Sequence, residues 1–439
     1  MTMKTPLFPA GFLRYGTMNI LGMLGISCYI LADTFFVARA TGADGLAALN
    51  LAIPFYSFIH GAGLMVGIGG ATRYSLLVGG GRDGQARSIF TQSLYGILFF
   101  SACFLLLGLF GAGWLAALFQ EEGAIRDMTA TYLRVIFLFA PAFLANNLLL
   151  SFVRNDGGPQ LAMLSMVVSS LSNILLDYLL LFPLDMGIFG AALATGFSPL
   201  VGMAILSRWF FSGRATFRLH PAKPDPGLTR TLWALGIPSL IGELSSGVVM
   251  VVFNLLILEL AGNLGVAAYG VVANLSLVAL ALFTGLGQGI QPLVSRSWGG
   301  GNMGEVRRLL RCCLITVLTM SLGLYVLIFL FAAPITALFN GEGNPLLQSM
   351  AEQGLRLYFT ALPFAGINLT VCACLGAMDR PRPAFLLSTL RGFAAILPLA
   401  VLLARLLGLT GVWLAFPAAE LLTAGAAIPC LKAGFSTQE

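Results

Sequence analysis

The feature that most constrains this chain is a series of twelve long apolar stretches that occupies almost its whole length. A helix that crosses the hydrocarbon core of a bilayer needs about 20 mostly apolar residues, and each stretch reaches that length. Only 10% of the 439 residues are charged, whereas soluble domains have about 25%. Because no room remains for a soluble catalytic domain, we predict an all-α integral membrane protein with twelve transmembrane helices and no enzymatic activity. The predicted crossings are Met18–Ala38, Ala47–Leu77, Ile89–Phe119, Thr129–Val153, Pro159–Phe182, Gly187–Phe211, Leu232–Ala261, Gly265–Ser295, Leu309–Leu338, Leu355–Met378, Pro383–Leu406 and Gly408–Leu431.

A polar segment divides these stretches into two sets of six. We expect an N-terminal lobe over residues 1–211, a linker over 212–230 and a C-terminal lobe over 231–439. Loops rich in Lys and Arg remain on the cytoplasmic side of a membrane, so we expect the linker and both termini to be cytoplasmic. The basic residues in and beside the linker are Arg208, Arg214, Arg218, Lys223 and Arg230.

An internal repeat relates the two halves at an offset of 220 residues, which places Gly79 on Gly299 and Gly42 on Gly262. The segment GGGRDGQAR begins at the first of these glycines, and GGGNMGEVR begins at its counterpart. Six crossings is an even number, so both copies have the same orientation, as in transporters built from parallel repeats. We therefore expect two pseudo-symmetric six-helix bundles around a central cavity, an arrangement that suits alternating access.

The major facilitator superfamily has the same six-plus-six plan, so the architecture alone does not identify a family. Four stretches in order resemble the multidrug and toxic compound extrusion (MATE) family, and within it the bacterial MepA-like branch. They are ADTFFVARATGADGLAALNLAIPF, FVRNDGGPQLAM, NILLDYLLLFPLDMGIFGAALAT and GLGQGIQPLVSRSWGGGN. The resemblance covers nearly the whole chain. It implies the MATE fold and a place in the bacterial cytoplasmic (inner) membrane.

Two acidic residues lie deep within apolar stretches of the first half. A charge at the bilayer centre costs about 3 kcal/mol, so Asp33 and Asp177 are candidates for functional groups. Asn173 precedes Asp177 by four residues, which places both side chains on one helix face. Thr195 falls in the next predicted helix. Oxygen ligands of these kinds suit H⁺ or Na⁺ rather than a soft transition metal.

The resemblance implies a role for this set. In the MATE family an Asp of the first helix, an Asn and an Asp four apart in the fifth and a Thr in the sixth form a cation site. We therefore expect ion coupling at Asp33, Asn173, Asp177 and Thr195, with H⁺ or Na⁺ as the coupling ion and no other metal or cofactor. The alternative is that these polar groups only pack helices together. The repeat offset shifts by one or two residues further along the chain, and the counterparts of these four residues are all nonpolar: Phe253, Ala394, Pro398 and Phe416.

The second half has ionisable residues of its own within apolar stretches. Glu243, Arg391 and Glu420 are expected to form a polar network that stiffens the C-terminal lobe. The sodium-driven branch of the MATE family has a functional acid in the seventh helix, but Glu243 lies in a different register from it. The tenth helix also has Gly376 where the family usually has Gln. The two histidines, His60 and His220, are too far apart in the sequence to suggest a metal site.

Two functions remain open. The first is a secondary antiporter that exports amphipathic, often cationic, organic compounds in exchange for H⁺ or Na⁺. The second is a flippase or exporter for a lipid-linked or amphiphilic biosynthetic product, which would need a basic cavity for phosphate. We expect small-molecule substrates and membrane lipids as partners, no nucleic acid, and a monomer.

Overall fold

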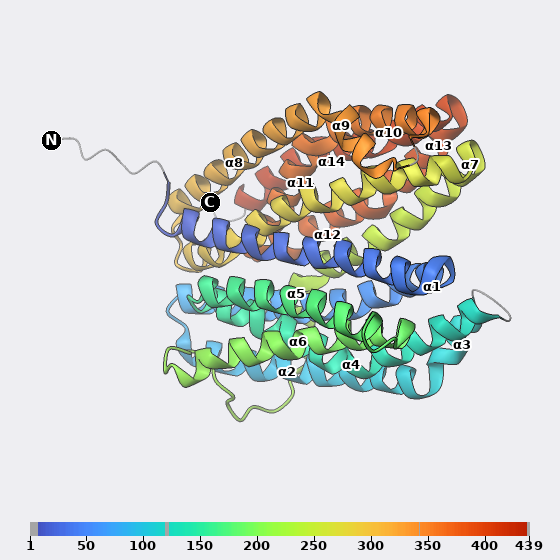
Figure 1. Cartoon of the computed structure of the whole chain (residues 1–439). Helices are drawn as coiled ribbons and strands as arrows, with labels where there is room; N and C mark the ends of the chain where they lie inside the picture. Colours follow the sequence, from blue (N-terminus) through green and yellow to red (C-terminus); the bar gives the residue numbers. More distant parts are fainter. Residues whose placement is uncertain (1–7, 119–122, 342, 437–439) are drawn as a thin grey trace.

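The structure is a computed structural model that describes residues 8–118, 123–341 and 343–436, and all regular elements in those ranges are helices (Figure 1). The predicted all-α fold is confirmed. In chain order the elements are α1 (Phe12–Gly79), α2 (Asp83–Leu106), η1 (Leu107–Gly111), α3 (Ala112–Ala117), α4 (Ala124–Asn155), α5 (Pro159–Leu181), α6 (Gly187–Phe211), α7 (Pro226–Gly299), α8 (Met303–Leu330), α9 (Ala332–Phe339), α10 (Pro345–Tyr358), η2 (Phe359–Ala361), α11 (Leu362–Ala377), α12 (Pro381–Thr389), η3 (Leu390–Ala394), α13 (Ile396–Leu407) and α14 (Leu409–Ser436).

Two of these helices are long enough to cross a membrane twice. α1 has 68 residues and α7 has 74, and each contains one residue with non-helical angles, Gly42 at φ 70° and Gly262 at φ 63°. Glycine adopts a positive φ without the steric cost of a β-carbon, so the chain changes direction at these two points. The described residues form ten apolar helices of membrane-spanning length, and with α1 and α7 counted twice they give the twelve predicted crossings. The predicted end of the third crossing, Phe119, lies outside the described residues.

The crossings pack into two helical bundles, one from α1 to α6 and the other from α7 to α14 (Figure 1). Each bundle has its own core of buried apolar side chains. The first core extends from Val37 to Leu232, and the second lies mainly between Phe253 and Ala427. Contacts between the two bundles, such as those between α1 and α7, therefore join segments that are far apart in the sequence.

The segment between the bundles is fastened to the first one. Phe217 packs against Phe90 and Phe152, with ring centroids 4.9 and 5.3 Å away. Asp156, just after α4, accepts hydrogen bonds of 2.8 Å from the Trp209 indole and from the Thr216 backbone N–H. This linker is therefore an ordered part of the N-terminal bundle's surface.

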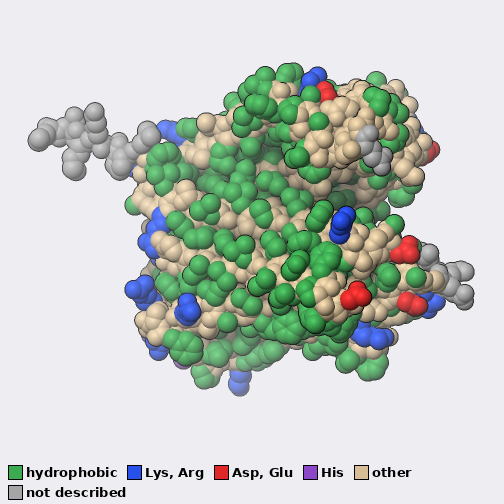
Figure 2. Space-filling model, viewed as in Figure 1, with side chains coloured by type: hydrophobic (Ala, Val, Ile, Leu, Met, Phe, Trp, Pro, Cys, Tyr) green, Lys and Arg blue, Asp and Glu red, His purple; other side chains and the backbone are tan. Residues whose placement is uncertain are grey.

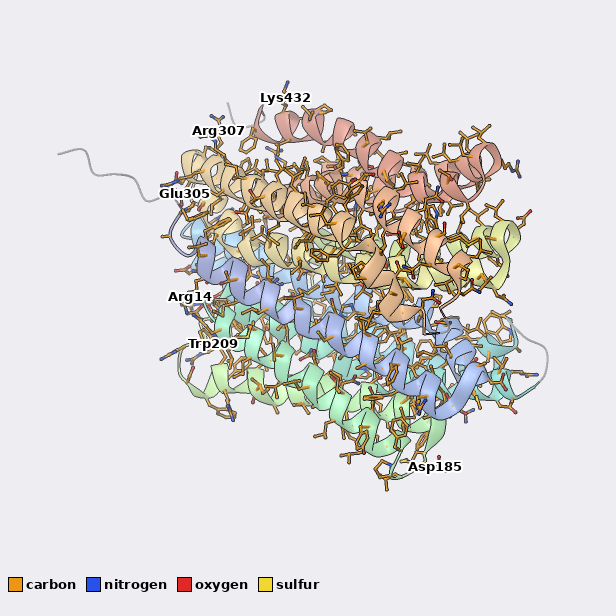
Figure 3. The ribbon with its side chains drawn as sticks, turned by 45° about the horizontal axis from the view of Figure 1, so that its top comes forward. Arg14, Asp185, Trp209, Glu305, Arg307 and Lys432 are labelled. Atoms are coloured by element: carbon orange, nitrogen blue, oxygen red, sulfur yellow. The ribbon has the colours of Figure 1, made fainter. Side chains whose placement is uncertain are left out.

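Basic side chains gather at one end of the molecule (Figure 2). Arg14, Trp209, Arg307 and Lys432 lie at this end, which we name the arginine-rich end, and Asp185 lies at the opposite one (Figure 3). The turns within α1 and α7 also lie at the opposite end, which we name the far end (Figure 1). The molecule thus has the charge asymmetry that the positive-inside rule describes.

Candidate functional site: a buried acidic pair and the seam between the bundles

The candidate ion site begins with the buried face of α5. Ser170, Asn173 and Asp177 follow one another at intervals of three and four residues, and all three are buried. After α5 the chain turns through Asp185 and Gly187, both at positive φ, and enters α6. This short turn sets α6 against α5 and brings Thr195, also buried, to the level of the α5 polar residues.

The structure brings the four predicted residues of the N-terminal half together. The carboxyl groups of Asp33 and Asp177 are in hydrogen-bond contact. With its amide oxygen facing α6, Asn173 donates to Asp177 Oδ2 at 3.1 Å and accepts from the Thr195 backbone N–H at 3.3 Å. Two ionised carboxylates this close inside a low-dielectric bundle would repel each other strongly, so the arrangement is costly unless a proton or another cation is shared between them.

The acidic pair also has unused acceptor capacity. Asp33 Oδ1 and Asp177 Oδ1 are buried and have no hydrogen-bond partner among the described residues. A buried carboxylate oxygen without a donor is costly, since it has lost its hydration without a replacement. Such oxygens have the chemistry to accept a proton or to coordinate a hard cation.

Sequence reasoning missed the tyrosines around this site. The Tyr132 side chain of α4 lies beside that of Thr195 in α6, and the Tyr29 and Tyr56 hydroxyls lie 3.0 Å apart. Tyr29 precedes Asp33 by four residues on the same helix, so its spacing already placed it on the face of the acid. Tyr132 had no comparable signal, because its position depends on how α4 packs against α6.

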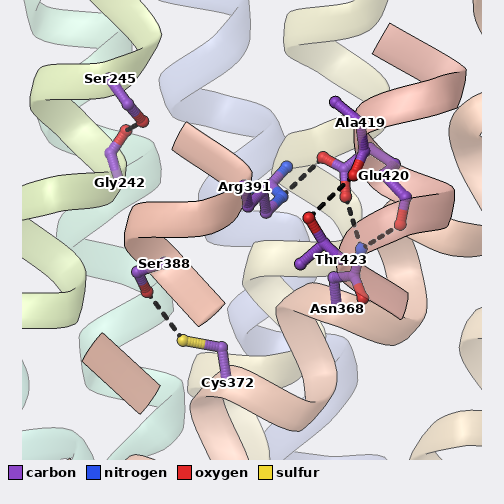
Figure 4. Close-up of polar contacts among 9 residues, drawn as sticks. All are labelled: Gly242, Ser245, Asn368, Cys372, Ser388, Arg391, Ala419, Glu420 and Thr423. Carbon is purple, nitrogen blue, oxygen red and sulfur yellow. Dashed lines mark hydrogen bonds and ion pairs between the residues drawn. The ribbon is translucent and has the colours of Figure 1, made fainter. Parts of the chain in front are cut away.

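A second polar group joins three helices of the C-terminal bundle (Figure 4). Arg391 Nε donates to Glu420 Oε1 at 2.6 Å, and Asn368 Nδ2 donates to Glu420 Oε2 at 2.7 Å. Glu420 is almost completely buried, so its charge depends on these two donors. Arg391 lies in η3, a π-helical turn, and such turns often occur at functional sites.

Glu243 does not join Arg391 and Glu420 as the sequence analysis expected. Ser245 of α7 faces Gly392 of η3, where a β-carbon on the glycine would come within 2.6 Å of the Ser245 side chain. Glu243 lies two residues earlier, about 200° around the helix, and so faces the other way. Its Oε2 lies 3.4 Å from Nδ1 of His60 in α1. The acid is therefore at the contact between the two bundles.

The bundles meet along a seam of glycines in the half of the molecule nearer the arginine-rich end. A β-carbon on Gly236 of α7 would overlap the carbonyl oxygen of Met65 in α1, and one on Gly69 would overlap that of Leu232. A β-carbon on Gly285 would lie 2.9 Å from Cα of Ile20. Such close backbone contact leaves no passage between the bundles there.

Polar contacts across the seam reinforce this closure. Asn19 Nδ2 donates to the Gly285 carbonyl at 2.7 Å, and the Arg73–Asp379 ion pair measures 3.0 Å. The buried guanidinium of Arg154 donates to Asn19 Oδ1 at 2.8 Å and to Gln288 Oε1 at 3.2 Å. The fourth predicted crossing ends at Val153, which leaves Arg154 in the loop after it, and nothing in its local sequence pattern indicates burial between two bundles.

The bundles separate toward the far end. A β-carbon on Gly247 would be 3.7 Å from the Ser57 hydroxyl, and beyond this point a crevice of about 80 Å³ opens. The surface is hollowed between the two bundles on that side (Figure 2). The bundles are therefore in close contact toward the arginine-rich end and are separated by this crevice toward the far end. The crevice is lined by Asn50, Ile53, Pro54, Gly247, Met250, Val251 and Asn254.

Comparison with known proteins agrees with this arrangement. The profile of the MatE family matches residues 19–179 and 238–403, which is most of both bundles. The chain belongs to the MatE family. This membership places it among membrane transporters, and it confirms the resemblance found in the sequence.

Relatives and solved structures of the family match over nearly the whole length. The chain is 26% identical to the multidrug export protein MepA of Staphylococcus saprophyticus over 95% of this chain and 92% of that one. It is equally similar to MepA of Staphylococcus aureus strain MSSA476, over 97% and 93%. The fold is that of a MATE transporter crystallised with MaL6, with a TM-score of 0.90, 22% identity and coverage of 97% and 95%. A MATE transporter in an outward-facing conformation matches with a TM-score of 0.88, also at 22% identity, over 97% and 94%.

Proposed function

We propose that this protein is a secondary antiporter that exports amphipathic, cationic organic compounds in exchange for an entering ion. The observation that carries the proposal is the contact between Asp33 and Asp177, two buried carboxyl groups from different helices. Asn173 and Thr195 complete the coupling site. The relatives named multidrug export protein support the substrate class.

The ion we propose is H⁺, with Na⁺ as the second candidate. Adjacent carboxyl groups can hold one proton between them, which explains how both stay buried with so few donors. A gradient of one pH unit supplies about 1.4 kcal/mol, and a membrane potential of 100 mV supplies about 2.3 kcal/mol per charge. One or two ions therefore suffice to concentrate a substrate tenfold to a thousandfold.

The transport cycle that we propose is alternating access between residues 1–211 and residues 231–439, joined by the linker 212–230. The glycine seam closes the cavity at the arginine-rich end while the crevice opens at the far end. Export then requires the seam to part and the far end to close. Ion binding drives the cycle only if the ion prefers one of these two states, because a ligand indifferent to both shifts nothing.

We place the arginine-rich end and both chain termini in the cytoplasm of a bacterial cell, with the protein in the inner membrane as a monomer in contact with lipid. In this orientation the crevice faces outward, where the entering ion is concentrated. The charge asymmetry supports this orientation.

The second candidate function, a flippase for lipid-linked products, has less support. Arg391 is paired with Glu420, and Arg154 is buried within the closed seam. Neither guanidinium group is therefore available to bind a phosphate in the crevice.

Uphill transport in liposomes tests the proposal. We expect the purified parent protein to concentrate ethidium against its gradient when an inward pH gradient is imposed. Asp33→Asn and Asp177→Asn proteins should bind ethidium but lose uphill transport. An inward Na⁺ gradient that drives the parent equally well at constant pH would assign Na⁺ instead, and undiminished uphill transport by both variants would remove the site from the mechanism.

A further inference from the structure

The contact between His60 and Glu243 is built from both bundles. His60 belongs to the second crossing of α1, and Glu243 belongs to the first crossing of α7. Their Nδ1 and Oε2 atoms are 3.4 Å apart. Gly61 makes the approach possible, since a β-carbon there would lie only 3.2 Å from Cβ of Glu243.

The pair lies at the point where the seam ends and the crevice begins. On its arginine-rich side, α1 and α7 touch backbone to backbone at Met65 and Gly236, and on its far side they separate at Ser57 and Gly247. The His60 side chain is 24% exposed and that of Glu243 is 38% exposed. Both side chains are therefore partly exposed at the contact, whereas Met65 and Gly236 just behind it are buried.

The side chains of Tyr56 and Asn147, which contact His60, are uncharged. The Tyr56 ring stacks on the imidazole with centroids 6.0 Å apart, and its hydroxyl contacts Tyr29. From α4, Asn147 presents an uncharged amide, which donates to the His60 carbonyl. Among the described residues, the other charged groups near this part of α1 and α7 have partners of their own. Asp33 contacts Asp177, and Arg391 pairs with Glu420.

We propose that His60 and Glu243 form a second proton-binding site, which exists only while the two bundles are joined at the seam. A proton on the imidazole is held by the carboxylate across the contact, and it loses this partner when the bundles part. Histidine can change its charge within the physiological pH range. By linkage, a proton that binds more tightly to the joined state favours that state. Lowering the pH therefore favours the conformation closed at the arginine-rich end and open at the far end.

This inference rests on the proposed alternating access but not on the Asp33–Asp177 pair. A proton arriving through the crevice would keep the seam shut until it leaves, which delays the inward opening. The site thus adds a pH-dependent gate to a transporter whose coupling residues lie elsewhere in the N-terminal bundle.

The test measures the distance between the bundles at the arginine-rich end as a function of pH. A fluorophore pair is attached through non-natural amino acids at Gln85 of α2 and Arg382 of α12, both exposed, in the full-length protein in nanodiscs. We expect the ratio of closed to open molecules to rise about fivefold between pH 8 and pH 5.5, near the low end of typical coupling because the pair is partly exposed. His60→Gln and Glu243→Gln should each remove this rise, and the double variant should remove no more than either single one.

Matched controls separate the pair from general effects of charge. His220→Gln changes the other histidine, which contacts Thr91 only through its backbone, and Glu259→Gln changes an exposed acid of α7. Both should keep the fivefold rise. Repeating the His60→Gln measurement in an Asp33→Asn, Asp177→Asn background separates this site from the proposed coupling site, because the loss should persist there. A parental pH response in both His60→Gln and Glu243→Gln, or its loss in His220→Gln, overturns the inference.

Discussion

The backbone of Gly236 in α7 lies directly against the carbonyl oxygen of Met65 in α1, with no space for a β-carbon between them. This contact joins the two bundles through backbone atoms, without any polar side chain. The two helices can approach this closely only because Gly236 has no side chain, so even a methyl group at this position should disturb the contact.

Gly236→Ala should weaken the closed conformation. The added methyl group overlaps the Met65 carbonyl, so the bundles must move apart or the helices must shift. We expect a lower thermal unfolding midpoint and at least a tenfold loss of export, measured on purified protein and in liposomes. Gly242→Ala is the control on the same helix, because a β-carbon there has nothing within 4 Å. It should be neutral or slightly stabilising, since Ala favours helix by about 1 kcal/mol over Gly; equal effects of both changes would contradict the seam.

Asp177→Asn should remove the competition between proton and substrate. If the acidic pair takes up the coupling proton, substrate affinity in the parent falls as the pH is lowered from 8 to 6, by about tenfold. The Asn side chain keeps the size of Asp177 but cannot titrate, so the affinity of the variant should vary little with pH. Ethidium fluorescence polarisation measures this directly. Asp185→Asn, in the turn after α5, should retain the parental pH dependence.

Tyr132→Phe should weaken coupling without abolishing it. The change removes the phenol hydroxyl beside Thr195, a polar contact worth about 1 kcal/mol, and leaves both carboxyl groups in place. We expect a threefold to tenfold lower rate of proton-driven export in liposomes with little change in stability. The matched control is Tyr178→Phe on the exposed face of α5, which should behave like the parent.

Glu420→Gln should destabilise the C-terminal bundle. The change leaves the Arg391 guanidinium partly buried without its counter-charge, at a cost of about 3 kcal/mol. A double variant, Arg391→Met with Glu420→Leu, should recover most of that loss because no lone charge remains. Thermal unfolding of the purified proteins measures both effects. A double variant as unstable as Glu420→Gln alone would show that the pair does more than balance charge.

The sequence predicted those features that depend on spacing within one helix or on the repeat. Twelve apolar stretches account for the crossings, and the four-residue spacing of Asn173 and Asp177 places them on one face of α5. The turns at Gly42 and Gly262 coincide with the repeat offset, although the sequence alone did not show that helix continues on both sides of each glycine.

The features that depend on helix rotation and on contacts between bundles were not predictable. α7 is apolar on all sides, so no amphipathic pattern indicates which way Glu243 points, and its contact with His60 required both bundles to be in place. Arg154 resembles an ordinary loop charge in the sequence. Its burial follows from the seam closing over it, which no local pattern encodes.

The linker has a consequence for how the two halves move. Beyond Phe217 it stays attached to α2: His220 bonds Thr91, and Lys223 and Asp225 bond Gln92 through their backbones. These hydrogen bonds hold the connecting chain against the N-terminal bundle up to Pro226, where α7 begins. The two halves are therefore held together at this corner. In the proposed transport cycle, the arginine-rich end would open by a rotation of one half about this corner.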